Sequence, residues 1–439
     1  MRRVNGFSGQ LYRPGDGGYD AERAGHNLAV DHRPAYVVGA TGAGDVATAV
    51  GRAVAEGLGV GVLATGHGPS VAADARTVLV NTRRMNGVTV DPVARVARVE
   101  AGARWRDVLA ATTPHGLAPL NGSSPAVGAV GYTLGGGAGL LGRRHGYAAD
   151  HVRRFELVTA TGESVSLGPA AAGDLFWALC GAGQGRFGVV TAMEIDLFPV
   201  ARLYGGGLFF AADAVGDVAR AYAAWTDDVP DGMASSLKLA RSPDVPGVPG
   251  PLRGRFTAHV RIAWSGRADE GERLVAPLRA VAPRVLDTVG DMPYAEVGTI
   301  HAEPTEPVSA HDRGTLLGSL PPRAVETLLA LAGPAAGAPF VCELRHFGGA
   351  FARPQGPRNA ICHREAAFSL FTAVAPDPDP SQDALHEALR PWALGSFTNF
   401  LGAGQAATGS YDARTAGRLA ALERHHDPEG VFRTRRPLT

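Results

Sequence analysis

The sequence has 439 residues, and its 42 Lys+Arg and 42 Asp+Glu give a formal net charge of +0. At ~150 residues per domain, this length predicts two or three domains with a sizeable core. A neutral chain lacks the basic excess that nucleic-acid binders and polybasic membrane-surface proteins need, so we expect neither partner. Lys238 is the only lysine, which excludes a lysine-containing GxxxxGK phosphate loop.

The cysteines and the N-terminus predict a cytoplasmic protein. Cys180, Cys342 and Cys362 are odd in number and form no CxxC pair, which argues against a disulfide framework and fits a reducing compartment. The first residues break into glycine and proline before any apolar run, so we expect no signal peptide. No stretch approaches ~18 uninterrupted apolar residues, so we expect no transmembrane helix.

Short apolar runs alternate with amphipathic stretches from residue 35 to residue 116. This order predicts a packed layer of strands and helices. The expected strands are 35–40, 60–66, 77–82 and 94–103, and the expected helices are 45–58 and 103–116.

The 59 glycines are about twice the usual share of ~7%. They gather in three loops, at 65–70, 128–146 and 181–188. Two GxGxxG matches occur, but neither lies between a strand and a helix, as a Rossmann turn requires. Glycine runs let many main-chain N–H groups approach a diphosphate, so we predict a flavin dinucleotide held mainly by backbone. The alternative is that these glycines serve tight turns alone.

From about residue 201 the pattern changes to antiparallel strands with interleaved helices, an α+β region. A proline-rich surface loop is expected at 242–254, a helix at 269–281, and one last helix within 413–432. The expected strands are 203–210, 235–240, 254–264, 338–347 and 366–375.

Several long motifs follow one another in a distinctive order: LATGHG, NGSSPAVGAVGYTLGGGAGLLGRRHGYAADHV, DLFWALCGAGQGRFGVVT and, near the end, YDARTAGRLAALERHHDPEGVF. Together they resemble the berberine-bridge-enzyme-like branch of the vanillyl-alcohol-oxidase flavoproteins. The resemblance implies an α+β fold, with a two-part PCMH-type FAD-binding domain and an antiparallel-sheet substrate domain with helices on one face. The FAD-binding domain would comprise residues 1–200 and 391–439, and the substrate domain residues 201–390.

The resemblance also implies a covalent FAD. His67 matches the histidine that many relatives bond to the flavin 8α-methyl group. Relatives with a second bond carry a cysteine where this chain has Ser124, so at most one bond is expected. Val127 stands where the family's oxidases often carry a small residue that admits oxygen. The implied FAD contacts are Thr65, Gly66, His67, Gly68, Ser70, Ser124, Val127, Gly128, Thr133, Gly135, Gly136, Gly137, Gly185, Val189 and Asn399.

The proton acceptors that are usual in the family are missing. Its YxN segment reads Phe397-Thr398-Asn399 here, followed by Phe400, and its strand glutamate aligns with Leu370. Another residue must accept the proton, if any does.

His259 is the first candidate. Strand alternation puts it on one face with Thr257 and Arg261, and the resemblance lays that strand over the flavin. A partly exposed strand histidine without a catalytic role is the alternative.

Lys238 and Arg345 are further candidates. A lysine near an apolar pocket can have a lowered pKa, although a solvated surface lysine is equally consistent. Arg345 could pair with a substrate carboxylate or simply with Glu343 on the same face. Weaker candidates near the glycine loop are Tyr132, His145 and Tyr147. The group His425, His426 and Asp427 ends the last helix, and we expect it to be solvated and to hold no metal.

We therefore expect an FAD-dependent oxidase that acts on an alcohol, an amine or an activated C–H bond of a hydrophobic small molecule, in secondary metabolism, with O2 as acceptor. Because both usual bases are missing, a second hypothesis is a flavin-scaffolded cyclase or isomerase with no net redox. A non-catalytic flavin-binding protein is the third. The neutral charge puts no electrostatic obstacle in the way of a homo-oligomer.

Overall fold

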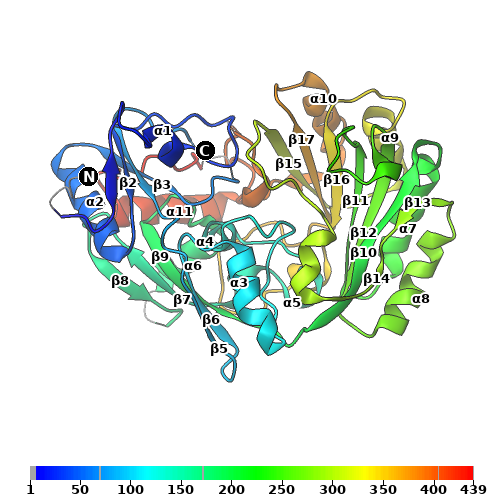
Figure 1. Ribbon diagram of the computed structural model, residues 1–439, viewed down its shortest axis with the longest axis horizontal. Coiled ribbons are helices and arrows are strands. Elements are labelled where there is room, and N and C mark those ends of the chain that lie inside the picture. Colours follow the sequence, from blue (N-terminus) through cyan, green and yellow to red (C-terminus); the bar gives the residue numbers. More distant parts are fainter. Residues whose placement is uncertain (1–5, 69–70, 171–172, 404, 439) are drawn as a thin grey trace.

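The computed structural model describes residues 6–68, 71–170, 173–403 and 405–438. The chain forms two parts that lie side by side (Figure 1). One part contains two smaller sheets and both ends of the chain, and the other contains a large sheet with helices on its outer face. Within the described residues, no helix is both long and apolar enough to cross a membrane.

A mixed four-stranded sheet lies near the N-terminus. Its strands β2 and β3 run parallel to β4, and all residues of β2 and β4 are buried, as expected for strands covered on both faces. The sheet order is β1 (Gln10–Tyr12), β2 (Tyr36–Gly39), β4 (Thr77–Asn81) and β3 (Gly59–Leu63), with helices α1 (Tyr19–Arg23) and α2 (Ala43–Ala55). These strands and α2 confirm the elements predicted there.

A five-stranded antiparallel sheet completes this part. It packs with its helices around buried aromatic side chains such as Trp105 and Phe155. Its order is β5 (Val88–Asp91), β6 (Val96–Glu100), β9 (Val189–Asp196), β7 (Val152–Val158) and β8 (Ser164–Leu167). The helices are α3 (Trp105–Thr112), α4 (Ala129–Leu134), α5 (Gly142–His145) and α6 (Gly173–Ala182).

The second part is a nine-stranded antiparallel sheet. Its order is β13 (Arg284–Asp287), β10 (Arg202–Ala211), β12 (Phe256–Trp264), β11 (Met233–Arg241), β16 (Val341–His346), β17 (Phe368–Val374), β15 (His311–Leu317) and β18 (Ala393–Gly395), and β14 (Gly290–Pro293) also pairs with β10. The helices are α7 (Val215–Asp228), α8 (Ala268–Arg279), α9 (Pro322–Ala332) and α10 (Pro380–Ala388). The five predicted strands are confirmed, and β18 extends the sheet beyond residue 390.

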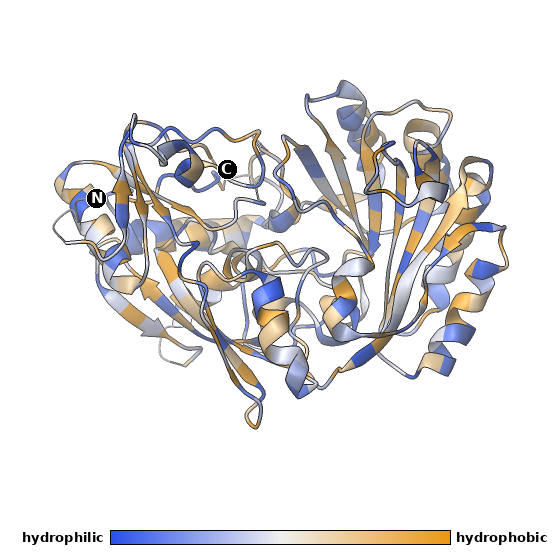
Figure 2. Ribbon diagram, in the orientation of Figure 1, coloured by the Kyte–Doolittle hydropathy of each residue, from blue (hydrophilic) through white to orange (hydrophobic). Residues whose placement is uncertain are grey.

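The two faces of the large sheet differ in polarity. Alternate residues such as Leu237, Val260 and Leu344 are buried in the core beneath the helices. Their neighbours along the strands, among them Lys238, Arg261 and Glu343, lie on the other face. Figure 2 shows this alternation as bands along the strands. The polar face is therefore the one turned away from the helices, toward the first part of the molecule (Figure 1).

The C-terminal segment returns to the first part. Helix α11 (Ala413–His426) packs against α6. The Asp427 carboxylate then accepts hydrogen bonds from the amides of Val431 (2.7 Å) and Phe432 (3.0 Å), which shapes the turn after the helix. Phe432, 1% exposed, joins the core of the four-stranded sheet. The predicted α+β fold is thus confirmed.

Candidate functional site

A cavity of ≈ 390 Å³, the main cavity, is lined by both parts of the molecule. The first part contributes the loop after β3, the segment leading into α4 and the loop after α6. The large sheet contributes Asp312, Glu343, Arg345 and Phe371. The segment 398–401 and parts of the C-terminal tail close the remaining wall.

The loop after β3 is held tightly in place. The backbone of Gly66 has φ +70, and a Cβ atom there would come 2.5 Å from Gly25 Cα, so only glycine fits. The amide of Gly128 donates to Thr65 Oγ1 over 3.2 Å, which joins this loop to the start of α4. The amides of His26 and Asn27 donate to the carbonyls of Thr65 and Gly66, each at 2.9 Å.

His67 has an unused nitrogen in this cavity. Its Nδ1 lies 2.9 Å from Thr65 Oγ1, and its ring stacks on His26 with 3.8 Å between ring centroids. Its Nε2 is buried without a hydrogen-bond partner among the described residues. Burial, helped by His26 and Arg104, lowers the pKa of His67 to about 3. The imidazole is therefore neutral at pH 7, the state in which it can act as a nucleophile.

Most residues with an implied FAD contact line the main cavity. They are Thr65, Gly66, His67, Gly68, Ser124, Val127, Gly128, Gly185, Val189 and Asn399. Ser70 lies outside the described residues.

Thr133, Gly135, Gly136 and Gly137 are not part of this lining. The Thr133 hydroxyl donates to the carbonyl of Ala129 over 2.9 Å, inside α4. A Cβ on Gly137 would come 2.5 Å from the Tyr132 ring, so packing alone requires glycine there.

The Phe-Thr-Asn segment holds the end of α4. Asn399 accepts a hydrogen bond from the amide of Gly137 (3.0 Å) and donates one to the carbonyl of Tyr132 (2.9 Å). The Phe400 ring lies 5.5 Å from the Phe371 ring, between centroids, and 5.1 Å below the Arg345 guanidinium. These two aromatic rings make one wall of the main cavity apolar.

Two rows of polar side chains cross the inner face of the large sheet. The register pairs His259 with Lys238 and Lys238 with Glu343. In the neighbouring row it pairs Arg261 with Ser236 and Ser236 with Arg345. The candidates predicted from strand alternation therefore share one face, as expected.

Only one of these candidates, Arg345, reaches the main cavity. His259 stacks on Phe209 at 3.7 Å between ring centroids, is 6% exposed, and lines neither this cavity nor the smaller one described below. Lys238 lines neither cavity, and burial lowers its pKa to about 8. Tyr132 lines the main cavity, whereas Tyr147 and His145 do not.

Glu343 is a buried carboxylate held between two arginines. Arg345 Nη2 lies 3.1 Å from Oε1, and Arg261 Nη1 lies 3.2 Å from Oε2. Burial acts to raise the pKa of Glu343, but the two guanidinium groups outweigh burial and hold it well below its ordinary value. Glu343 is therefore ionised and presents a fixed negative charge to the cavity.

Two other carboxylates were missed from the sequence. Glu303 follows His301, whose Nδ1 lies 3.5 Å away, and Asp312 lies on β15. Burial raises the pKa of Asp312 to about 6. The segment HDRGTLL of β15 is too polar at its start to look like a strand, and this hid Asp312. Only its alternate pattern of small and polar residues could have indicated an inward position.

The alignment of the strand glutamate with Leu370 needs a correction. Leu370 is completely buried in the core beneath the helices, whereas its neighbour Phe371 lines the main cavity. Because strand side chains alternate between faces, a one-residue slip exchanges the two sides of the sheet. The cavity-facing position is thus aromatic.

The group His425, His426 and Asp427 was expected to hold no metal. Among the described residues, no group of three or more histidine, cysteine or acidic side chains is placed to hold a metal ion. Asp427 instead bonds to the backbone of the final turn.

The fold and the main cavity fit a flavin-binding oxidoreductase. A family model described as an FAD binding domain matches residues 34–168. (R)-6-hydroxynicotine oxidase of Paenarthrobacter nicotinovorans is 28% identical over 459 residues, covering 97% of this chain and 96% of the relative.

Solved structures agree with this likeness. 6-Hydroxy-D-nicotine oxidase from Arthrobacter nicotinovorans has a TM-score of 0.82 at 24% identity, and Physcomitrella patens BBE-like 1 has 0.83 at 19%. Each comparison covers 98% of this chain and 97% of the other. The chain thus contains an FAD binding domain and is an FAD-dependent oxidoreductase.

Proposed function

We propose that the protein is an oxidase with FAD bonded once, through His67, and that it oxidises an alcohol, an amine or an activated C–H bond of a hydrophobic small molecule in secondary metabolism. The observation that carries this proposal is the buried, unpartnered Nε2 of His67 in the main cavity. The low pKa of His67 keeps this nitrogen deprotonated and available. Ser124 also lines the cavity but is no thiol, so a second bond is not proposed.

The lining of the cavity suits this reaction. Bound FAD supplies a two-electron acceptor for a hydride. Phe371 and Phe400 offer an apolar wall to the substrate. Asp312 lines the same cavity, and its pKa of about 6 suits a carboxylate that accepts the hydroxyl or amine proton, whereas Glu303 has a pKa lowered to about 2 and is a weaker base. The reason for the cyclase alternative, a site without a base, is therefore weak, and we favour net oxidation.

The relatives support oxygen as the acceptor. One is named an (R)-6-hydroxynicotine oxidase and another a chitooligosaccharide oxidase. Val127 lines the cavity, and by the family resemblance it stands where oxidases often carry a small residue that admits oxygen. The three free cysteines fit a reducing compartment, so we propose the cytoplasm as location. A homo-oligomer stays a prediction.

Among the sequence candidates, Arg345 is proposed to orient the substrate because its guanidinium lines the cavity. His259 and Lys238 stay predictions as proton acceptors. If either accepts the proton, replacing His259 with Gln or Lys238 with Met slows flavin reduction by substrate at least tenfold. Unchanged rates in both variants would remove both residues from the reaction.

The covalent bond is tested by acid precipitation of the purified flavoprotein. We expect the yellow colour to stay with the precipitated wild-type chain and to pass into the supernatant for His67→Ala. His115→Ala, which changes an exposed histidine, serves as the matched control and retains the colour. Wild-type flavin that is released by acid would contradict the bond.

Net oxidation is tested with (R)-6-hydroxynicotine and a panel of aromatic alcohols and amines under anaerobic conditions. A compound that is a substrate bleaches the flavin band near ~450 nm, and air restores it with formation of peroxide. Conversion of a compound while the band stays oxidised throughout would instead support the cyclase.

A further inference from the structure

A second, much smaller cavity lies behind Arg345 on the inner face of the large sheet. This rear cavity has a volume of ≈ 20 Å³ and is lined by Gly139, Leu140, Ala234, Ser235, Ser236, Arg261, Ile262, His301, Arg345, His346 and Phe351. A volume of ~10–15 Å³ on this measure is enough for one water-sized particle. Arg345 is in both linings, so the rear cavity and the main cavity are neighbours.

Arg261 is buried at this cavity with donors that have no acceptor. Its side chain is 3% exposed, and its Nε and Nη1 make no hydrogen bond with the described residues. Nη1 lies 3.2 Å from Glu343 Oε2 but without hydrogen-bond geometry. An arginine has donors only, and leaving them unpaired in the interior costs several kcal/mol. An acceptor in the rear cavity would remove this cost.

His346 adds another donor. Its Nε2 lies 2.9 Å from Arg143 Nη1, and because arginine only donates, this nitrogen must accept. Burial, together with Arg143, lowers the pKa of His346 to about 3, so the ring is neutral and its proton is on Nδ1. This Nδ1 is buried and has no partner among the described residues. Ser236 is 1% exposed, and its Oγ has no partner with hydrogen-bond geometry, although it lies close enough to Glu343 to help lower the pKa of that carboxyl group.

The charge of the site favours an anion over a water molecule. The described residues that line the rear cavity include two guanidinium groups, Arg261 and Arg345, and no carboxylate. The one carboxylate that both guanidinium groups approach within 4 Å is Glu343. His301 is neutral because burial lowers its pKa to about 4.

Arg143, buried and 2.9 Å from His346, adds a third guanidinium group. Glu303, 3.5 Å from His301 and ionised because its pKa is lowered to about 2, adds a second carboxylate. Positive charge is therefore in excess around the rear cavity, and a monovalent anion reduces this excess.

We propose that the rear cavity binds one halide ion, which accepts hydrogen bonds from Arg261, His346 and Ser236. The cavity admits a single atom, which excludes phosphate, sulfate and carboxylates. Chloride is the halide that cells supply. The ion compensates the positive charge of Arg261 from the side of the rear cavity. Glu343 and Arg345 keep their ion pair at the main cavity. The inference does not depend on the reaction proposed there.

The first test is a crystal structure of the full-length flavoprotein grown with sodium bromide. Bromide scatters anomalously and water does not. We expect one anomalous peak enclosed by Arg261, Ser236 and His346. A water molecule in that position, with no anomalous signal, would overturn the proposal.

The second test measures the melting temperature in solution. Sodium bromide is compared with sodium methanesulfonate, whose anion is too large for the cavity, at equal ionic strength. For the wild type we expect an additional rise of about 2 °C at a bromide concentration ten times the dissociation constant. Equal responses to the two salts would contradict the site, and a crystallographic peak without this response would mean binding at crystal concentration only.

Variants show whether the bromide-specific rise of the melting temperature comes from the rear cavity. Arg261→Met removes the charge and the donors, and Ser236→Val fills the cavity while Arg261 stays. Both are expected to lose the bromide-specific rise, and Ser236→Val keeps the test decisive if Arg261→Met does not fold. Arg255→Met, at an exposed arginine just before β12, is the matched control and retains the rise. A bromide response that persists in Ser236→Val would place the ion elsewhere.

Discussion

Burial favours the neutral form of both histidine and glutamate, so it lowers the pKa of His67 and acts to raise the pKa of Glu343 in the main cavity. It drives His67 to its neutral form, because burial together with His26 and Arg104 outweighs the opposite effect of Glu303 on the pKa of His67. It would neutralise Glu343 as well, but Arg345 and Arg261 each lie within about 3.2 Å of its oxygens and keep it ionised. The main cavity is therefore lined by a neutral imidazole, His67, and by a fixed negative charge, Glu343.

Asp312 makes stability depend on pH. Burial raises its pKa from the ordinary 3.8 to about 6, so the native state holds this proton more tightly than the unfolded state does. Ionisation of Asp312 therefore lowers stability as the pH rises from about 4 to about 6, and the loss is complete above that range. We expect Asp312→Asn to raise the free energy of unfolding by about 1–2 kcal/mol at pH 7 and to leave it unchanged at pH 4.

Urea denaturation at both pH values measures this difference. Asp213→Asn, at an exposed aspartate with no resolved interaction, is the matched control and changes little at either pH. A gain for Asp312→Asn that is equal at pH 4 and pH 7 would contradict the assignment, since a pH-independent effect cannot come from ionisation.

At the scale of single elements, strand alternation explains most of what was predicted. The run LYGGGLFF was predicted as a strand and is β10, although three glycines usually weaken a strand. The structure gives a reason for one of them. A Cβ on Gly207 would lie 2.1 Å from His259 Nε2, so the glycine leaves room for the ring that crosses from β12.

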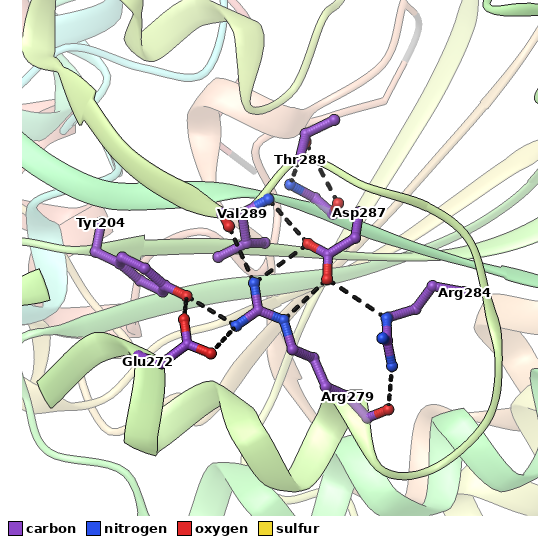
Figure 3. A network of polar contacts seen from close by, with 8 residues as sticks. Tyr204, Glu272, Arg279, Arg284, Asp287, Thr288 and Val289 are labelled. Atoms are coloured by element: carbon purple, nitrogen blue, oxygen red, sulfur yellow. Dashed lines mark hydrogen bonds and ion pairs between the residues drawn. The ribbon is translucent and has the colours of Figure 1, made fainter. Parts of the chain in front are cut away.

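Helix α8 is joined to the sheet by a polar network around Arg279 (Figure 3). Arg279 donates to Asp287 (2.9 Å), Glu272 (2.7 Å) and the Tyr204 hydroxyl (2.8 Å). A lysine ammonium cannot reproduce the planar fork that serves these partners together. We expect Arg279→Lys to lower the free energy of unfolding by about 1–2 kcal/mol.

Chemical denaturation followed by circular dichroism measures this loss. Arg273→Lys, at an arginine with a 69% exposed side chain on the same helix, is the control and is expected to change stability by less than about 0.5 kcal/mol. Equal losses in the two variants would mean that the network contributes no more than one surface ion pair.

At the scale of the whole molecule, the C-terminal segment returns to the first part and pairs with its four-stranded sheet. The amide of Val60 on β3 donates to the carbonyl of Val431 over 2.6 Å, and Arg433 donates back to Val60 over 3.1 Å. Phe432, between them in sequence, is 1% exposed. Strand β3, which leads into the loop that contains His67, is therefore stabilised by a segment more than 350 residues further along the sequence.

Phe432→Ala tests this dependence. Loss of a buried phenylalanine costs about 3–5 kcal/mol, and the four-stranded sheet adjoins the loop that contains His67. We expect a lower melting temperature and a lower ratio of flavin to protein in the purified variant. Val93→Ala, at a 93% exposed side chain, is the control and keeps both values. Full flavin content in Phe432→Ala would show that the cofactor site does not depend on the C-terminal segment.

The sequence by itself determined the strands and helices with clear apolar periodicity, the α+β class, and the glycine loops from which His67 and its neighbours line the main cavity. These features are local: spacing along the chain decides which face a residue takes and which turns need glycine. Only the tertiary structure decided which inward-facing side chains meet. His259 and Arg345 share a face, yet the order of the strands leaves His259 away from the cavity and brings in Asp312 instead, while the segment before β15 brings in Glu303. Strand order depends on pairing between distant segments, and no short stretch of sequence contains that information.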